Sequence, residues 1–338
     1  MDYLIPQFRD SLNEEGDVDV AGYTFRRDNI LMELEQEGYQ EAFNEWLQVR
    51  QEENLNRADE ILTLYDNQRR FKKFKEIFAR GAIIPFIGAG MSMPSEYPGW
   101  TKFLYQVLED TTVNQDNFNA TLSEGLYEEA AQMLCDALPA GCFLEHVENA
   151  FGAEQEVNGV IQRLPYLFKN AVITTNFENL VKRCYGNVQV DFNEELLGAD
   201  AIELPRLLGE NQRVLVKLHG KANSSRQRIL TKTEYDNHYD NDDALESVIE
   251  AMSNRTLLFL GCSLTVDRTL QCLARIIEKK GHENVPRHYA FLKLNEDDDR
   301  LARRDQLAAA NIYPIWYTED HDESIEALLE KLAEGVNL

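Results

Sequence analysis

The chain has 338 residues, of which 43% are hydrophobic and 10% aromatic, and its formal net charge is −25. These values predict a globular protein and argue against direct binding to nucleic acid or to an anionic membrane. The five cysteines contain no Cys-x-x-Cys pair, so no metal site is expected. Without a signal sequence or an apolar run of the roughly 20 residues that cross a bilayer, we expect a cytoplasmic protein with reduced thiols.

Residues 1–75 are predicted to form a separate helical segment with a role in assembly or regulation. Up to residue 60 the segment carries 16 acidic and 5 basic residues, and its apolar residues recur at helical spacing. A basic cluster follows, from Arg69 to Arg80, with phenylalanines between the charges. We interpret it as a solvated helix face that packs its phenylalanines on a sheet, although contact with a phosphate or a partner is the alternative.

A strand, a glycine turn and a helix are predicted between residues 82 and 110. The apolar run Ile83 to Ile87 leads directly into Gly88-Ala89-Gly90-Met91-Ser92, and helical periodicity begins at Trp100. Glycines allow the backbone to approach a pyrophosphate closely, and free N–H groups near a helix start can bind its charge. A tight βα turn without any ligand is the alternative, because glycine suits any such turn.

From residue 82 onward, short apolar strands alternate with helical segments. This alternation predicts an α/β fold: a Rossmann-like parallel sheet with helices on both faces, in a domain over 76–338. A mostly helical insert is expected at 100–170, after the first strand. The predicted strands are 82–87, 171–174, 188–191, 213–218, 256–261, 288–294 and 312–317. The predicted helices are 100–110, 124–137, 142–150, 177–184, 245–253, 266–279, 297–310 and 322–334.

Polar residues follow several of these strands at the point where each strand ends. They are Thr175, Asn176 and Glu178 after the second strand, His219 after 213–218, Gly261 and Ser263 after 256–260, and Asn295 after 288–294. Ligands of open parallel sheets bind at the carboxyl ends of the strands. We therefore expect these residues to meet the glycine turn at one edge of the sheet.

Two of these residues are candidates for chemistry. His219 can accept a proton at neutral pH, but a structural histidine bonded to a nearby carbonyl is an equal alternative. The Asn176 carboxamide offers a donor and an acceptor for a ribose hydroxyl or a water, and a helix N-cap is the alternative. Glu178 is more typical of the first turn of a helix than of a ligand contact. Cys262 has no neighbouring base in the sequence that would activate it.

The ordered set Gly88-Ala89-Gly90-Met91-Ser92, Thr175-Asn176-Phe177-Glu178, Leu218-His219-Gly220, Gly261-Cys262-Ser263 and Leu294-Asn295 resembles the motifs of the sirtuin superfamily. Over roughly residues 80–335 it looks closest to the sirtuin-like NAD-hydrolysing effectors of bacterial anti-phage defence systems. Protein deacylases of the superfamily hold zinc with two Cys-x-x-Cys pairs, which this chain lacks. Tyr97-Pro98-Gly99-Trp100 also stands where they carry an Asp-Phe-Arg segment.

The resemblance implies a regulated NAD+ glycohydrolase that needs no metal and takes NAD+ as its substrate. Its products would be nicotinamide and ADP-ribose, and its role would be defence by NAD depletion. His219 would be the general base and Asn176 would orient the water or ribose hydroxyls. The cofactor-binding residues would be Gly88, Ala89, Gly90, Ser92, Thr175, Glu178, Gly261, Ser263 and Asn295.

Because free NAD hydrolysis would poison the cell, the resemblance also implies control by homo-oligomer formation or by an activating partner such as a HerA-type ATPase. The alternative function is a non-catalytic NAD or ADP-ribose sensor, or a scaffold subunit of a defence complex.

Overall fold

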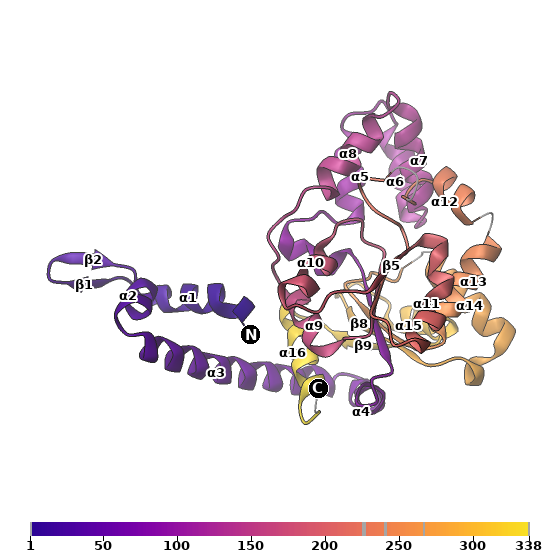
Figure 1. The fold of residues 1–338 in the computed structure, drawn as a ribbon. Helices are drawn as coiled ribbons and strands as arrows, with labels where there is room; N and C mark the ends of the chain where they lie inside the picture. The colour runs from indigo at the N-terminus through magenta and orange to yellow at the C-terminus, as the bar shows by residue number, and fades with distance from the viewer. Residues whose placement is uncertain (1, 225–227, 240–241, 266–267, 337–338) are drawn as a thin grey trace. The chain divides into compact units, whose positions relative to one another are not determined.

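The computed structural model describes residues 2–224, 228–239, 242–265 and 268–336, and Figure 1 shows its fold. The chain divides into two compact units, Met1–Glu60 and Ile61–Leu338. The boundary expected after residue 75 falls inside the second of these units. None of the helices among the described residues is long and apolar enough to cross a bilayer.

The first unit is built from helices and one antiparallel hairpin. Its small core forms around Phe8, whose ring centroid lies 5.2 Å from that of Phe43 and 5.8 Å from that of Trp46. Asp28 is fully buried and pairs with Arg9 at 2.7 Å, which offsets the loss of its hydration. The elements that begin in this unit are η1 (Asp2–Leu4), α1 (Ile5–Glu14), β1 (Val18–Val20), β2 (Tyr23–Phe25), α2 (Arg27–Leu34) and α3 (Gln36–Thr63).

The second unit contains a seven-stranded parallel sheet with the strand order β5-β6-β4-β3-β7-β8-β9. The predicted α/β class and parallel sheet are therefore confirmed, and all but one of the predicted strands are present. The strands are β3 (Ile83–Ile87), β4 (Ala171–Thr174), β5 (Glu194–Leu197), β6 (Val214–Lys217), β7 (Thr256–Leu260), β8 (His288–Lys293) and β9 (Ile312–Tyr317).

The strand predicted at 188–191 is wrong. Val188 and Gln189 form a turn after a helix, in which Gln189 has a φ of +59° and donates its N–H to the Gly186 carbonyl at 3.0 Å. The fifth strand in chain order starts later, at Glu194. Val190 packs partly buried against the core without a strand, so its apolar character gave a misleading signal.

Helices cover both faces of the sheet, as predicted. Ile83 and Ile87 of β3 pack in one core cluster with α4, α5, α7, α8, α10 and α16, whereas Ile84 and Phe86 pack in a second cluster with helices α11 to α15. The helices are α4 (Asn67–Phe78), α5 (Trp100–Leu108), α6 (Gln115–Ser123), α7 (Tyr127–Ala137), α8 (Cys142–Phe151), α9 (Leu164–Leu167), α10 (Leu180–Asn187), α11 (Leu204–Gly209), α12 (Lys232–Tyr239), α13 (Asp242–Ser253), α14 (Arg268–Lys280), α15 (Arg300–Ala309) and α16 (His321–Ala333). Short 3-10 helices are η2 (Ala89–Ser95), η3 (Val160–Arg163), η4 (Gly198–Glu203) and η5 (His282–Asn284).

The helical insert expected at 100–170 contains α5 to α9 and separates β3 from β4. The single helix predicted at 124–137 begins later, at Tyr127, because Gly125 adopts a φ of +76° and ends the preceding turn. The first two residues of the helix predicted at 266–279 lie outside the described residues.

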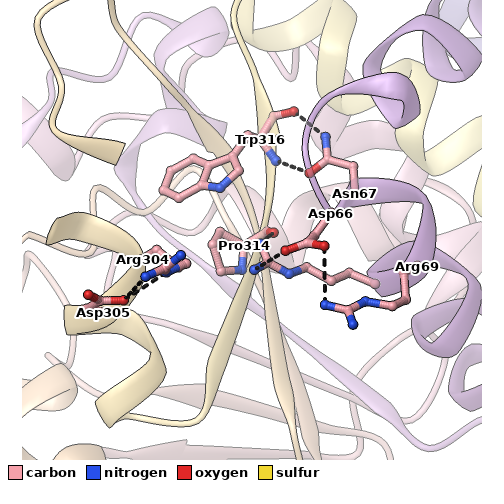
Figure 2. Close-up of polar contacts among 8 residues, drawn as sticks. Asp66, Asn67, Arg69, Arg304, Asp305, Pro314 and Trp316 are labelled. Carbon is pink, nitrogen blue, oxygen red and sulfur yellow. Dashed lines mark hydrogen bonds and ion pairs between the residues drawn. The ribbon is translucent and has the colours of Figure 1, made fainter. Parts of the chain in front are cut away.

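Helix α4 protects the outer edge of β9 with one buried side chain, Asn67 (Figure 2). The Asn67 amide nitrogen donates to the Trp316 carbonyl at 2.7 Å and to the Ile61 carbonyl at 2.8 Å. Its oxygen accepts the Trp316 N–H at 3.0 Å, so the amide takes the place of a neighbouring strand. Arg70 donates to the Pro314 carbonyl at 2.6 Å on the same strand. These contacts satisfy backbone groups that an edge strand would otherwise leave open.

We predict that Asn67→Ala lowers the free energy of unfolding by about 3 kcal/mol, because it leaves buried backbone groups of Trp316 and Ile61 without partners. Urea unfolding at neutral pH measures this change. Arg69→Ala is the matched control on the same helix, since the Arg69–Asp66 ion pair is exposed and is worth at most about 1 kcal/mol. Equal effects of the two substitutions would contradict the edge-protecting role of Asn67.

Candidate active site

The candidate site lies where the chain reverses its direction of travel across the sheet. From β3 the chain continues to β4, β5 and β6 on one side, and it then crosses to β7 on the other side. Crevices at such switch points, outside the carboxyl ends of the strands, are the usual ligand sites of open parallel sheets. The loops that follow β3 and β7 meet here: the Gly88 N–H donates to Leu260 and the Gly90 N–H to Gly261, both at 2.9 Å.

Glycine is required at this junction because the two backbones touch. A Cβ on Gly88 would lie 2.5 Å from the Gly261 oxygen, and a Cβ on Gly261 would lie 2.5 Å from the Met91 nitrogen. Gly261 also has a φ of +66°, a conformation that residues with a side chain rarely adopt. The glycines predicted from the sequence therefore have a structural reason besides any contact with a ligand.

A cavity of about 310 Å³ opens beside this junction, a size at the lower end of that found for ligand sites. Seven of the predicted site residues line it: Gly88, Ala89, Gly90, Thr175, His219, Gly261 and Ser263. The other four, Ser92, Asn176, Glu178 and Asn295, do not line it. The cavity also has a wall from the helical insert, which supplies Trp100, Tyr127 and Glu128.

Asn176 and His219 occupy equivalent positions on neighbouring strands. In the pairing of β4 with β6, Thr174 lies opposite Lys217, and each candidate residue follows two positions later. The ring of Phe177, next to Asn176, lies 6.4 Å from the His219 ring between centroids. The parallel register therefore brings the two candidates to the same edge of the sheet.

Asn176 is buried in a polar network under the glycine loop. Its amide nitrogen donates to the Gly88 carbonyl and to the Ser92 hydroxyl, each at 3.0 Å, and Ser92 donates to the Glu178 carboxylate at 2.6 Å. The Gly88 carbonyl can only accept, so these contacts fix the orientation of the amide. Its oxygen is buried and has no partner among the described residues. Asn176 is thus an oriented acceptor, and Ser92 and Glu178 hold it in place.

His219 is a half-buried imidazole held by aromatic rings. Its ring centroid lies 6.2 Å from that of Trp100 and 5.7 Å from that of Tyr235, and its Nε2 is 3.0 Å from the Tyr235 hydroxyl. Nδ1 has no partner in the described part of the chain. Burial, with a smaller effect from His238, lowers the pKa of His219 to about 4. The imidazole is therefore neutral at physiological pH and can accept a proton.

Lys217 joins the segments that carry Asn176 and His219, and the sequence analysis did not identify it. It is 1% exposed, and its Nζ donates to the carbonyls of Phe177 and Glu178, both at 2.8 Å. Burial lowers the pKa of Lys217 to about 8. A lysine at the end of the apolar run Val214-Leu215-Val216 was the available signal, because a buried amine needs nearby acceptors.

The two remaining predicted residues are near the surface. The Ser263 hydroxyl is exposed and lies 3.5 Å from the Thr265 hydroxyl at the rim of the cavity. Asn295 follows β8, and its backbone and side-chain N–H groups both donate to Asp298, at 2.8 and 3.1 Å. In this structure Asn295 therefore organises its own turn. Among the described residues, no cluster of His, Cys, Asp and Glu has an arrangement that could hold a metal ion.

The structure adds three cavity residues from distant parts of the chain. Trp100 begins α5, Glu128 lies on α7, and Arg268 lies on α14, where it pairs with Glu128 at 2.6 Å. None follows a strand, so the strand-end rule could not find them. Trp100 was noted only because it occupies the segment that replaces the deacylase motif.

The two histidines with the most strongly lowered pKa predict a pH dependence of stability. Burial lowers the pKa of His219 to about 4 and that of His288 to about 3, below the usual value of ~6.5. Between those values the unfolded chain binds more protons than the folded chain, so stability present above pH ~6.5 is lost as the pH falls.

We expect the free energy of unfolding to decrease below pH ~6.5 by up to about 1.4 kcal/mol per pH unit for each histidine. Urea unfolding of the wild type and of the His288→Asn variant over this range measures the slope. The variant should lack the part of the pH dependence that His288 contributes. Identical slopes would show that His288 is not neutral in the folded chain.

The glycine junction gives a second prediction. Gly261→Ala should lower the free energy of unfolding by about 3 kcal/mol, because it adds both a backbone clash and an unfavourable φ. Gly99→Ala is the control, since Gly99 lines the same cavity but a Cβ there meets nothing within 4 Å. Chemical denaturation measures the free energy of unfolding of both variants. Equal values would show that the junction rearranges to accept the added methyl group, which would contradict the prediction.

The chain is similar in sequence to several known proteins. A SIR2-like domain family matches residues 170–315, which include the segments of Asn176, His219, Gly261 and Asn295 but not the loop at 88–92. The NAD(+) hydrolase ThsA of Enterococcus faecium is 24% identical over 234 residues, 68% of this chain and 46% of that protein. Defense-associated sirtuin 2 of Bacillus subtilis is 22% identical over 216 residues, 61% of this chain and 20% of that protein.

Among solved structures, one described as "The Structural basis of Sirtuin Substrate Affinity" covers 78% of this chain and 99% of its own, with a TM-score of 0.36 and 15% identity. That similarity is too low to carry an argument about the site. The chain spans less than half the length of the two curated relatives. The resemblance to the sirtuin superfamily is confirmed by the SIR2-like domain family, which this chain matches over residues 170–315.

Proposed function

We propose that the chain is an NAD+ glycohydrolase, which cleaves the bond between nicotinamide and ribose to give nicotinamide and ADP-ribose. The observation that carries the proposal is a neutral imidazole and an oriented carboxamide at equivalent ends of neighbouring strands, at the switch point of the sheet. The name of the Enterococcus relative, NAD(+) hydrolase ThsA, supports the same reaction.

The departure of the leaving group, nicotinamide, needs little assistance from the protein. Nicotinamide departs as a neutral molecule from a cationic glycosidic nitrogen, so no general acid is needed. The chain has to stabilise an oxocarbenium-like ribose and to position a water at C1′. Asn176 does not line the cavity, so it would act from beneath the glycine loop, where its oxygen would accept a hydrogen bond from a water or ribose hydroxyl that reaches it. His219 would take the proton that the water releases.

The cavity offers contacts for the rest of the substrate. The Ala89 N–H and the Ser263 hydroxyl would bind the diphosphate and ribose oxygens. Gly88 and Gly90 would shape the loop rather than donate to the ligand, because their N–H groups already bond to the β7 loop. Trp100 would present an aromatic face beside His219 for the nicotinamide ring. Asn295 would use its side-chain oxygen for the adenosine ribose, because its N–H groups already bind Asp298.

We propose that this activity serves anti-phage defence by NAD depletion; the name of the Bacillus relative, Defense-associated sirtuin 2, supports a role in defence. Control by homo-oligomer formation or by a partner such as a HerA-type ATPase is part of the proposal. The first unit, Met1–Glu60, is the candidate for that contact. It exposes large apolar side chains, among them Tyr23 at 70% and Leu34 at 73%.

Nicotinamide release from NAD+ tests the proposal. His219→Ala and Asn176→Ala should each reduce kcat by about 10²–10⁴-fold, the range of general-base assistance, and should change KM less. His282→Ala, which removes an exposed histidine away from the cavity, is the matched control. Mass spectrometry of the products separates ADP-ribose from a cyclised form, and urea unfolding checks that the variants fold.

Two outcomes would contradict the proposal. Equal nicotinamide release from the wild type and both site variants would show that these residues are not catalytic. Binding of NAD+ without any release, with and without candidate partners, would leave the chain as a sensor or scaffold.

A further inference from the structure

An ion pair in the cavity wall joins the helical insert to the far side of the sheet. Glu128 of α7 accepts from Arg268 of α14 at 2.6 Å, and both side chains are about four-fifths buried. The Arg268 guanidinium lies 4.6 Å from the centre of the Tyr235 ring, and its Nη1 is 3.8 Å from the Asp236 carboxylate. Tyr235 in turn contacts His219. Tyr235 therefore connects the ion pair to the proposed base, His219.

Arg268 is the single lysine or arginine among the described residues that line the cavity. The chain as a whole carries a net charge of −25, so its general field disfavours an anionic ligand. A diphosphate that enters this cavity needs a compensating cation, and guanidinium binds phosphate oxygens through two parallel N–H groups. In the structure this cation is already neutralised by Glu128.

The surroundings of Glu128 make its carboxylate easy to protonate once Arg268 leaves. Burial is the main cause that raises the pKa of Glu128 to about 7; Arg268 opposes the shift, and nearby Glu129 and Asp236 add to it. The charged groups that act on the Glu128 carboxylate come from three helices. Glu129 lies on the same helix as Glu128, Asp236 lies on α12, and Arg268 lies on α14. Arg268 is the one cation acting on Glu128 in this set.

We propose that Arg268 exchanges partners when a ligand with a diphosphate group binds: its guanidinium moves from Glu128 to the phosphate oxygens, and Glu128 takes up one proton from solvent. The proton taken up by Glu128 offsets one of the two negative charges that the diphosphate brings. The identification of the ligand as NAD+ or ADP-ribose rests on the proposed function. The exchange itself requires only a diphosphate in this cavity.

Calorimetric titration with ADP-ribose, which the proposed reaction does not consume, tests the exchange. Measured in two buffers with different ionisation enthalpies, binding should take up about half a proton near pH 7 and nearly one proton near pH 8, because Glu128 is then ionised before binding. The affinity should fall by up to about tenfold per pH unit above that range.

Three variants of the full chain sharpen the test. Glu128→Gln should abolish proton uptake and bind ADP-ribose about tenfold more tightly near pH 8, since no carboxylate at position 128 has to be protonated. Glu129→Gln is the matched control, because it removes a carboxylate from the adjacent position and should keep the proton uptake. Arg268→Gln should weaken binding by about 10–100-fold, the range of a hydrogen bond to a charged group.

The outcomes separate this inference from the proposed function. ADP-ribose binding without proton uptake, or equal behaviour of Glu128→Gln and Glu129→Gln, would overturn the exchange even if nicotinamide is released from NAD+. Proton-linked binding of ADP-ribose with no nicotinamide release would support the exchange and contradict the hydrolase. An absence of ADP-ribose binding at millimolar concentration would overturn the exchange. The proposed hydrolase activity would then be tested separately, by nicotinamide release from NAD+.

Discussion

The candidate site depends on the contact between the backbones of two glycine loops. The loop after β3 and the loop after β7 hydrogen-bond directly, with 2.9 Å between the Gly90 nitrogen and the Gly261 oxygen. A single methyl group on Gly88 or Gly261 would prevent this approach. Because β3 and β7 flank the switch point, the contact closes the floor between them and leaves the cavity open on one side. The glycines Gly88, Gly90 and Gly261 thus serve the architecture, because the N–H groups of Gly88 and Gly90 are used in the junction itself.

Buried polar groups connect that floor to the candidate chemistry. Asn176 binds the Gly88 carbonyl, and Lys217 binds the segment that carries Asn176 while lying two residues before His219. Each of these groups loses hydration on burial, which costs free energy unless partners replace the water. Lys217 has those partners, whereas one atom each of Asn176 and His219 does not among the described residues. Of these two residues, His219 lines the cavity, whereas Asn176 is buried under the glycine loop.

The sequence predicted the parts of the fold that depend on local pattern. Apolar runs marked β3, β4 and β9 closely, and the residues after the strands pointed to one edge of the sheet. It failed where an apolar residue packs without a strand, as Val190 does, and where a turn residue divides a helix, as Gly125 does. Trp100, Glu128, Tyr235 and Arg268 could not be predicted, because they reach the cavity from helices whose packing depends on the whole sheet. The roles of Asn176 and His219 remain predictions, now with a shared register and a defined set of contacts.

Asn67 has a consequence for how copies of this chain can associate. By engaging both backbone groups of Trp316, its amide occupies the hydrogen-bonding positions that an added strand would need. Continuous sheets between subunits, and the fibrous aggregates that begin with them, require such open positions. Addition of a strand at Trp316 of β9 is therefore blocked, and a second copy of the chain that approached this edge would have to bind through side chains.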